Sequence, residues 1–114
     1  MYRRGAIVVA SDPFGNTPRR PYLVVSDETH PFAGEQYIAL GISTKEYDKS
    51  VPLAGAFVAG TLNQESFVAP WAVVSLRETN IERAVARISK PTVETAVRRM
   101  VAFAGYRDAS DTAE

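Results

Sequence analysis

The chain has 114 residues and no cysteine, and its 13 basic side chains balance 13 acidic ones. This length suits one domain with its own core, and the missing cysteines exclude disulfides and thiolate metal sites. No apolar run approaches the roughly 20 residues of a membrane span, and the apolar run at residues 6–10 is too short for a signal peptide. We therefore expect a cytoplasmic protein that uses no membrane anchor, metal or other cofactor.

The charges are unevenly placed along the chain. Residues 1–25 carry four arginines, Arg3, Arg4, Arg19 and Arg20, against one acid, Asp12. The last seven residues carry three acids and no base. We expect a folded domain at 1–107, followed by an acidic, flexible tail at 108–114. Without that tail the body is net positive, which is a weak indication of an anionic partner.

The first three quarters of the chain predict β-structure. Short runs rich in Val, Ile, Phe and Tyr, at 6–10, 22–25, 37–42, 56–61 and 67–76, are divided by clusters of Gly, Pro, Asn and Asp. Residues 84–88 could add a sixth strand. Pro70 inside the longest run indicates an edge strand or a bulge. Short antiparallel strands without intervening helices predict a small, closed or half-closed barrel.

The spacing of apolar residues changes near the end of the chain. Apolar residues recur at helical spacing, at positions 93, 96, 97, 100, 101 and 104. Ser89-Lys-Pro supplies a helix start and Gly105 a stop. We expect Arg98 and Arg99, with Glu94, on the outer face of a helix that closes one side of the barrel.

The residue types restrict the available chemistry. The sequence has one histidine and no glycine-rich phosphate loop, and no nucleophile motif supports a Ser-His-Asp triad built on His30. A feasible reaction is one whose substrate brings its own nucleophile. RNA does so, because its 2′-hydroxyl can attack the adjacent phosphorus and leave a cyclic phosphate. The protein then has to position the backbone, stabilise charge and move a proton. Arginine suits the first two tasks, since its fork binds phosphate with two parallel hydrogen bonds.

Four segments, in this order, resemble the MazF/PemK toxins of toxin–antitoxin systems over roughly residues 3–104. They are RRGAIVVA at the first strand, RRPYLVVS at the second, YIALGIST followed by KEYDKSVPL at the third, and ESFVAPWAVVSL before the final helix. The order and spacing of these motifs are more specific than any one of them. The resemblance implies a mainly β fold, an SH3-like antiparallel barrel of the CcdB/MazF/PemK type with a C-terminal helix. It also implies an endoribonuclease that cleaves single-stranded RNA without metal and that a cognate antitoxin neutralises.

By the same resemblance the catalytic arginine is Arg20, immediately before Pro21, and the catalytic hydroxyl falls on Ser43. Arg20 would act on the scissile phosphate and in proton transfer, and Ser43 would hold a phosphoryl oxygen. Arg19, Thr44 and Lys45 would bind substrate, with Thr44 as a possible substitute for Ser43. Alternatively, Ser43 and Thr44 only form a turn at the end of one strand, and Arg19 and Arg20 are only solvent-exposed side chains at the end of another.

The chain also departs from the family pattern. Its first loop is shorter, and there Phe14 either stacks on a base or folds onto the core. Ala72 and Val74 stand where the family often has Gln and Arg, which puts RNA specificity and activity in doubt. His30 has no family counterpart, and it is a candidate substrate-binding residue because it lies in a predicted loop. Trp71 is expected in the core or at a dimer contact.

Several expected partners and two alternative functions follow. The family works as a symmetric homodimer with its RNA groove across the junction, so a homodimer and an antitoxin peptide are the expected protein partners, and DNA is not an expected substrate. A gyrase poison of the CcdB type would share the barrel, but it depends on an apolar C-terminus with Trp, whereas this chain ends DASDTAE. A non-catalytic RNA- or protein-binding barrel, an inactivated relative, stays open.

Overall fold

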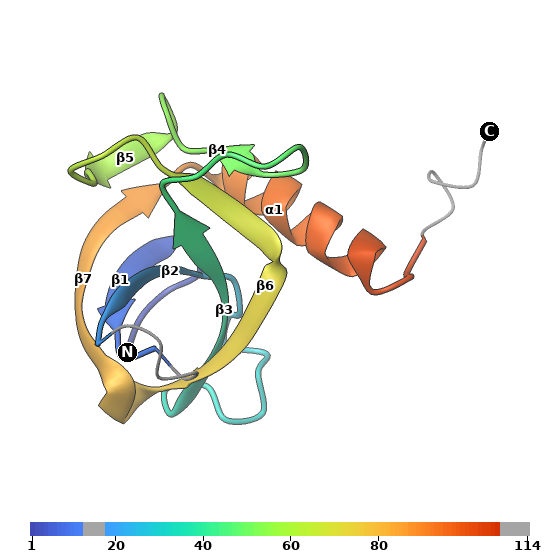
Figure 1. Cartoon of the computed structure of the whole chain (residues 1–114). Coiled ribbons are helices and arrows are strands. Elements are labelled where there is room, and N and C mark those ends of the chain that lie inside the picture. Colours follow the sequence, from blue (N-terminus) through green and yellow to red (C-terminus); the bar gives the residue numbers. More distant parts are fainter. Residues whose placement is uncertain (13–17, 108–114) are drawn as a thin grey trace.

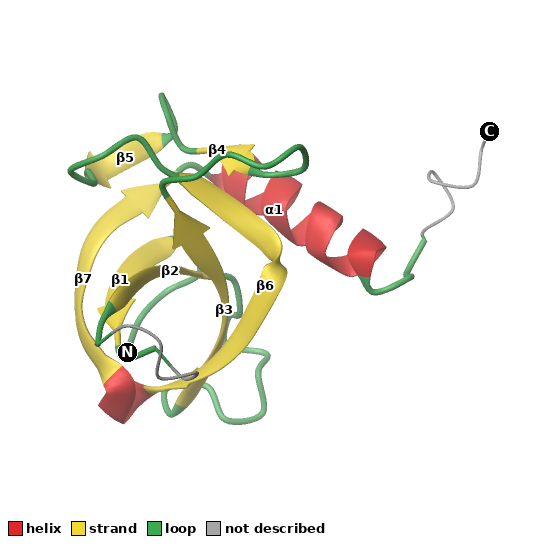
Figure 2. Ribbon diagram, in the orientation of Figure 1, coloured by secondary structure: helices red, strands yellow, loops and turns green. Residues whose placement is uncertain are grey.

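The computed structural model describes residues 1–12 and 18–107 of the chain. Figure 2 shows the mainly β architecture, with one α-helix near the C-terminal end. The strands are β1 (Ala6–Ala10), β2 (Arg20–Val24), β3 (Gln36–Ser43), β4 (Val51–Pro52), β5 (Phe57–Gly60), β6 (Phe67–Arg77) and β7 (Ile81–Ile88). A short 3-10 turn, η1 (Glu78–Asn80), joins β6 to β7, and helix α1 spans Lys90–Phe103.

All seven strands belong to one antiparallel sheet in the order β4-β6-β3-β2-β1-β7-β5. The sheet curls, so that β6 and β7 approach each other through η1, and α1 lies beside β6 (Figure 1). The half-closed barrel with a C-terminal helix is therefore confirmed. Of the five predicted runs, the first matches β1 residue for residue and the other four differ from their strands by one or two residues at an end; the sixth strand is real and begins earlier than predicted, at Ile81. The two-residue strand β4 was not anticipated.

The curled sheet buries both of its faces. Alternate residues of β1, β2 and β3 therefore contribute to two separate apolar clusters. The first cluster takes Ile7, Leu23 and Leu40 and is covered by Val93 and Ala96 of α1; the second takes Val8, Tyr22 and Ala39. Because strands buried on both sides read as continuous apolar runs, the sequence of these segments shows little alternation.

Pro70 lies at a bulge in β6, beyond the two residues of that strand that pair with β4. In the pairing of β3 with β6, Gly41 lies opposite Ala69 while Leu40 lies opposite Val73, so residues 70–72 have no partner in β3. A proline fits in this unpaired stretch because it has no N–H to donate. At a paired position it would remove a hydrogen bond from the ladder. A Cβ atom on Gly41 would lie 3.2 Å from the Cβ of Ala72, so the bulge approaches β3 closely at this point.

Helix α1 begins and ends at the expected signals, with Ser89 at the N-cap and Gly105 in the left-handed region at φ 92°. One orientation was wrong. Arg99 does not lie on an outer face, because its guanidinium donates hydrogen bonds to the carbonyls of Lys49 and Ser50, at 3.2 and 3.0 Å. The charge at this position anchors the β3–β4 loop to the helix.

Two further expectations concern the position of Trp71 and the C-terminal tail. Trp71 is 44% exposed and does not belong to either apolar cluster. The predicted acidic tail, residues 108–114, lies outside the described residues. Within the described part of the chain, no helix is long and apolar enough to cross a membrane.

Candidate active site on the rim of the barrel

Arg20 and Ser43 lie at adjacent ends of two neighbouring strands. Tyr22 of β2 pairs with Gly41 of β3, and continuing that antiparallel register by two residues brings Arg20 to Ser43. Arg20 begins β2 and Ser43 ends β3, so both lie at one rim of the sheet. They come from positions 23 residues apart in the sequence, and only the pairing of β2 with β3 brings them together.

The Arg20 side chain is half-buried, and its guanidinium end contacts the neighbouring strand β3. Its Nη2 donates a hydrogen bond to the carbonyl of Ile42, at 3.2 Å. The ion pairs that the described residues form do not include Arg20. Arg20 therefore presents a partly exposed guanidinium at this rim, in a position to meet an anionic group.

A buried phenol lies behind Arg20. Burial raises the pKa of the Tyr22 hydroxyl above its ordinary value; the negative charge of Asp12 adds to this rise, and the positive charge of Arg20 opposes it. Both charges therefore lie near the hydroxyl, which stays protonated at neutral pH. Asp12 is itself 8% exposed, so an acidic side chain lies beneath the surface of the rim. Sequence reasoning did not single out Tyr22 or Asp12 as site residues. Tyr22 belongs to an apolar strand run, and an acid after a strand, such as Asp12, is a common turn signal.

Ser43 begins a tight turn. Its Oγ accepts a hydrogen bond from the backbone N–H of Lys45, at 3.0 Å, and Thr44 and Lys45 are exposed. The Lys45 ammonium lies 5.0 Å from the centre of the Tyr47 ring. The turn alternative thus describes the local geometry correctly, and a turn hydroxyl at this rim can still donate its own proton to a ligand oxygen.

Three exposed aromatic rings continue from this turn. Tyr47, of the β3–β4 loop, meets Trp71 edge to face at 5.6 Å between ring centres, and Trp71 meets Phe103 of α1 at 6.2 Å. Each is close to half exposed. We call Tyr47, Trp71 and Phe103 the aromatic row. Exposed apolar area of this kind, on a small domain, is typical of an interaction surface.

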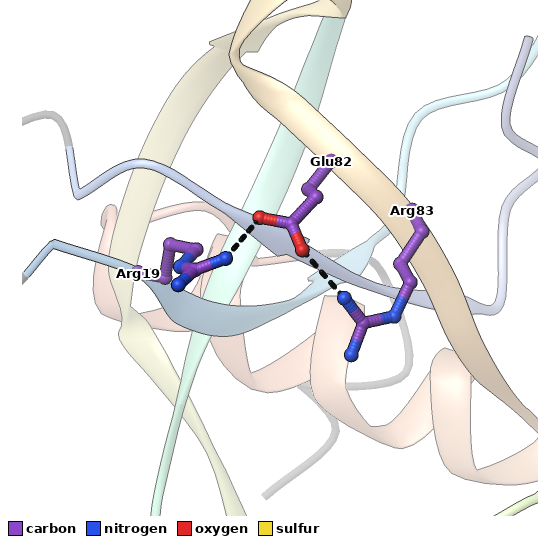
Figure 3. Close-up of polar contacts among 3 residues, drawn as sticks. All are labelled: Arg19, Glu82 and Arg83. Carbon is purple, nitrogen blue, oxygen red and sulfur yellow. Dashed lines mark hydrogen bonds and ion pairs between the residues drawn. The ribbon is translucent and has the colours of Figure 1, made fainter.

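Arg19 is held by an ion pair on the other side of Arg20. Its Nη1 donates to Oε2 of Glu82, at 2.6 Å, while Arg83 donates to Oε1 of the same carboxylate, at 2.5 Å (Figure 3). The hydrogen bond from Arg19 is the main reason that the pKa of Glu82 lies below its ordinary value. Because Arg19 and Glu82 are 63 residues apart, the sequence carries no local signal for this contact.

Two candidate residues do not join this rim. His30 lies in the loop after β2, beyond the opposite end of the strand from Arg20, and its Nδ1 accepts a hydrogen bond from the N–H of Phe32 at 2.9 Å. Phe14 lies outside the described residues. A hollow of about 590 Å³, lined by Tyr2, Arg3 and Arg87 among others, also lies at the His30 end of the strands. Among residues 1–12 and 18–107, no three His, Asp or Glu side chains come close enough together to hold a metal.

Comparison with known proteins gives likenesses in structure alone. No family model and no curated protein sequence matches the chain. An endoribonuclease in complex with its cognate antitoxin, from a mycobacterial species, matches with a TM-score of 0.70 and 13% identity, over 95% of this chain and 99% of its own. The toxin MazF-mt6 of Mycobacterium tuberculosis matches with a TM-score of 0.69 and 21% identity, over 90% and 98%. MazF in a MazE–MazF complex from Deinococcus radiodurans matches with a TM-score of 0.71 and 18% identity, over 93% and 98%.

These likenesses place the chain among small curled barrels closed by a C-terminal helix. Within that class the fold is that of the MazF toxins, matched along nearly the whole length of both chains. The fold that the sequence resemblance implied is therefore confirmed.

Proposed function

We propose that this protein is an endoribonuclease toxin of the MazF type that cleaves single-stranded RNA in the cytoplasm. One observation supports this most strongly: in a chain with the MazF fold, Arg20 at the start of β2 and Ser43 at the end of the neighbouring strand β3 lie at the same rim of the sheet. The two residues that the sequence motifs nominated separately thus share one surface.

The reaction uses the nucleophile of the substrate. The 2′-oxygen bonds to the adjacent phosphorus, the bond from phosphorus to the 5′-oxygen breaks, and the proton of the 2′-hydroxyl finishes on that departing oxygen. Arg20 donates hydrogen bonds to the non-bridging oxygens, where charge builds up, and takes part in moving the proton. Ser43 donates its hydroxyl proton to one of the same oxygens. Thr44 and Lys45 follow on the turn and hold the RNA backbone.

The activity is tested by incubating the purified protein with single-stranded RNA in EDTA. We expect products with a 2′,3′-cyclic phosphate and a 5′-hydroxyl, and no cutting of DNA or of RNA with a 2′-methoxy group at the cut site. Arg20→Ala should slow cleavage at least about 100-fold, the scale found when a donor to transition-state charge is removed. Ser43→Ala should slow it less, because Thr44 is adjacent.

Arg98→Gln serves as the control, since this exposed arginine on α1 lies outside the rim. Cutting of the methoxy-substituted RNA would exclude the mechanism, and undiminished cutting by Arg20→Ala would remove its central residue. If the wild-type protein cuts no RNA, the non-catalytic barrel becomes the better description.

The aromatic row supports a homodimer. Its rings come from a loop, a strand and a helix, and Val73 of β6 adds further exposed apolar area beside Trp71. A second copy of the chain, related by a two-fold axis, would cover such a face and place two Ser43 turns at one junction. Sedimentation at tens of micromolar should show a dimer, and a monomer at that concentration would contradict the assembly.

Antitoxin binding is proposed from the matched complexes, two of which hold an endoribonuclease or MazF with its antitoxin. A disordered acidic segment of such a partner would fold over the Ser43–Pro52 loop and cover Arg20. The sequence also predicts that this groove involves the Asp12–Pro18 loop, whose residues 13–17 lie outside the described residues. RNA and antitoxin should then compete. A complex with the peptide on the face away from Arg20 would contradict this proposal.

A further inference from the structure

Glu82 is the extra residue of a β-bulge. In the pairing of β1 with β7, Val9 lies opposite Arg83 and Ala10 lies opposite Ile81, so Glu82 has no partner in β1. Bulges redirect a side chain and are frequent beside active sites. Here the redirected carboxylate lies between two guanidinium groups, those of Arg19 and Arg83 (Figure 3).

The three side chains lie on the same rim as Arg20. Ala10, at the end of β1, pairs with Arg20 on one side and with Ile81 on the other. The step from β2 across β1 to β7 covers two strand spacings, about 10 Å. An RNA chain whose scissile phosphate contacts Arg20 could therefore reach Arg19 and Arg83 with its neighbouring nucleotides.

The contacts of Glu82 resemble those that a phosphate would make. Each of its two carboxylate oxygens accepts a hydrogen bond from a different arginine, and a phosphodiester offers two non-bridging oxygens to such a pair. The Arg19 and Arg83 side chains are 62% and 61% exposed and that of Glu82 is 38% exposed. Exposed ion pairs contribute little to stability, so a phosphate could displace the carboxylate at small cost.

We propose that Arg19 and Arg83 form a phosphate subsite for the RNA chain next to the Arg20–Ser43 site, and that Glu82 is the internal carboxylate that this phosphate displaces. The inference rests on RNA being the substrate, as proposed above. In the free protein Glu82 holds both arginines in place and neutralises one of their two charges. In the complex the carboxylate moves aside, and the phosphate takes both guanidinium groups.

The test measures binding of a single-stranded RNA that carries a 2′-methoxy group at the cut site, by fluorescence anisotropy at several salt concentrations. Arg83→Gln should weaken binding roughly fivefold at 0.1 M salt and lower the slope of log K against log salt by about 0.7, the value for one phosphate contact on a single strand. Glu82→Gln should strengthen binding about threefold to tenfold, because it removes a competitor held by two exposed ion pairs.

Matched controls separate the subsite from net charge. Glu94→Gln and Arg98→Gln change the same charges on the exposed side of α1, and each should shift affinity by less than twofold. In an Arg83→Gln background, Glu82→Gln should give a smaller gain than in the wild type, since one of its two ion pairs is already missing.

A chemical substitution identifies the phosphate itself. A neutral methylphosphonate is placed at successive positions of the RNA, and at one position near the cut it should weaken wild-type binding about fivefold while leaving Arg83→Gln unaffected. Equal gains from Glu82→Gln and Glu94→Gln would show that only net charge matters and would overturn the subsite, as would the lack of any position whose effect depends on Arg83.

The outcome is separable from that of the proposed activity. Binding that depends on Arg83 and Glu82 in a protein that cuts no RNA would support the subsite and refute the nuclease. Cleavage of RNA with no effect of either variant on binding would refute the subsite and leave the nuclease standing. No binding of RNA by the wild type would refute both.

Discussion

Gly60, at the end of β5, is the position where an added methyl group should be most harmful to the fold. Its φ is +64°, in the left-handed region that side chains disfavour. A Cβ there would lie 2.3 Å from the carbonyl oxygen of Val85 and 2.9 Å from the Cα of Ala86. Both are backbone atoms of β7 and cannot rotate away, so either β5 or β7 must move.

Gly55 provides a matched control for the change Gly60→Ala. Its φ is +77°, but a Cβ there would meet nothing within 4 Å. Gly55→Ala should therefore lose only the cost of the left-handed conformation, about 1–2 kcal/mol. Gly60→Ala should lose that amount plus the cost of overpacking, about 1–3 kcal/mol. Effects of alanine on the unfolded chain are common to both and cancel.

Urea unfolding of both variants, followed by far-UV circular dichroism, measures the difference. We expect Gly60→Ala to be less stable than Gly55→Ala by about 1–3 kcal/mol, with a melting temperature lower by at least about 4 °C for a domain of this size. Equal stability of the two variants would refute the close packing of β5 against β7 and the steric argument with it.

Three further predictions concern the rim. Arg99→Ala should lower the free energy of unfolding by about 1–2 kcal/mol, because the carbonyls of Lys49 and Ser50 lose a charged donor, and hydrogen exchange in the loop before β4 should rise; unchanged exchange would contradict the anchoring role. Arg19→Gln should raise the pKa of Glu82 toward its ordinary value, measured by NMR titration of the side-chain carboxyl. Since the folded-state pKa is depressed, the stability from this ion pair is present above the ordinary pKa of glutamate and is lost as pH falls through the lower, folded value; the variant should lack this part of the acid sensitivity. Trp71→Arg should convert the dimer to a monomer in sedimentation without loss of secondary structure, because the side chain is outside both apolar clusters, and a persistent dimer would place the interface elsewhere.

The sequence alone determined the elements whose signals are local. Runs of β-branched residues marked the strands, the helical period and its cap residues marked α1, and Pro70 marked an edge or a bulge in β6. The motif around Arg20 and the hydroxyl at Ser43 could be nominated by resemblance. These features depend on the conformational preferences of neighbouring residues, which do not require knowledge of the rest of the chain.

Only the tertiary structure decided which distant residues meet. Strand β4 exists because β6 passes beside residues 51 and 52, and two residues have no pattern of their own to reveal a strand. Arg99 turned inward because the loop before β4 offered it two carbonyls, and Glu82 reached Arg19 because a bulge in β7 redirected its side chain across the end of β1. In each case the contact follows from how the curled sheet brings its strands together, and a local pattern of hydrophobicity does not contain that information.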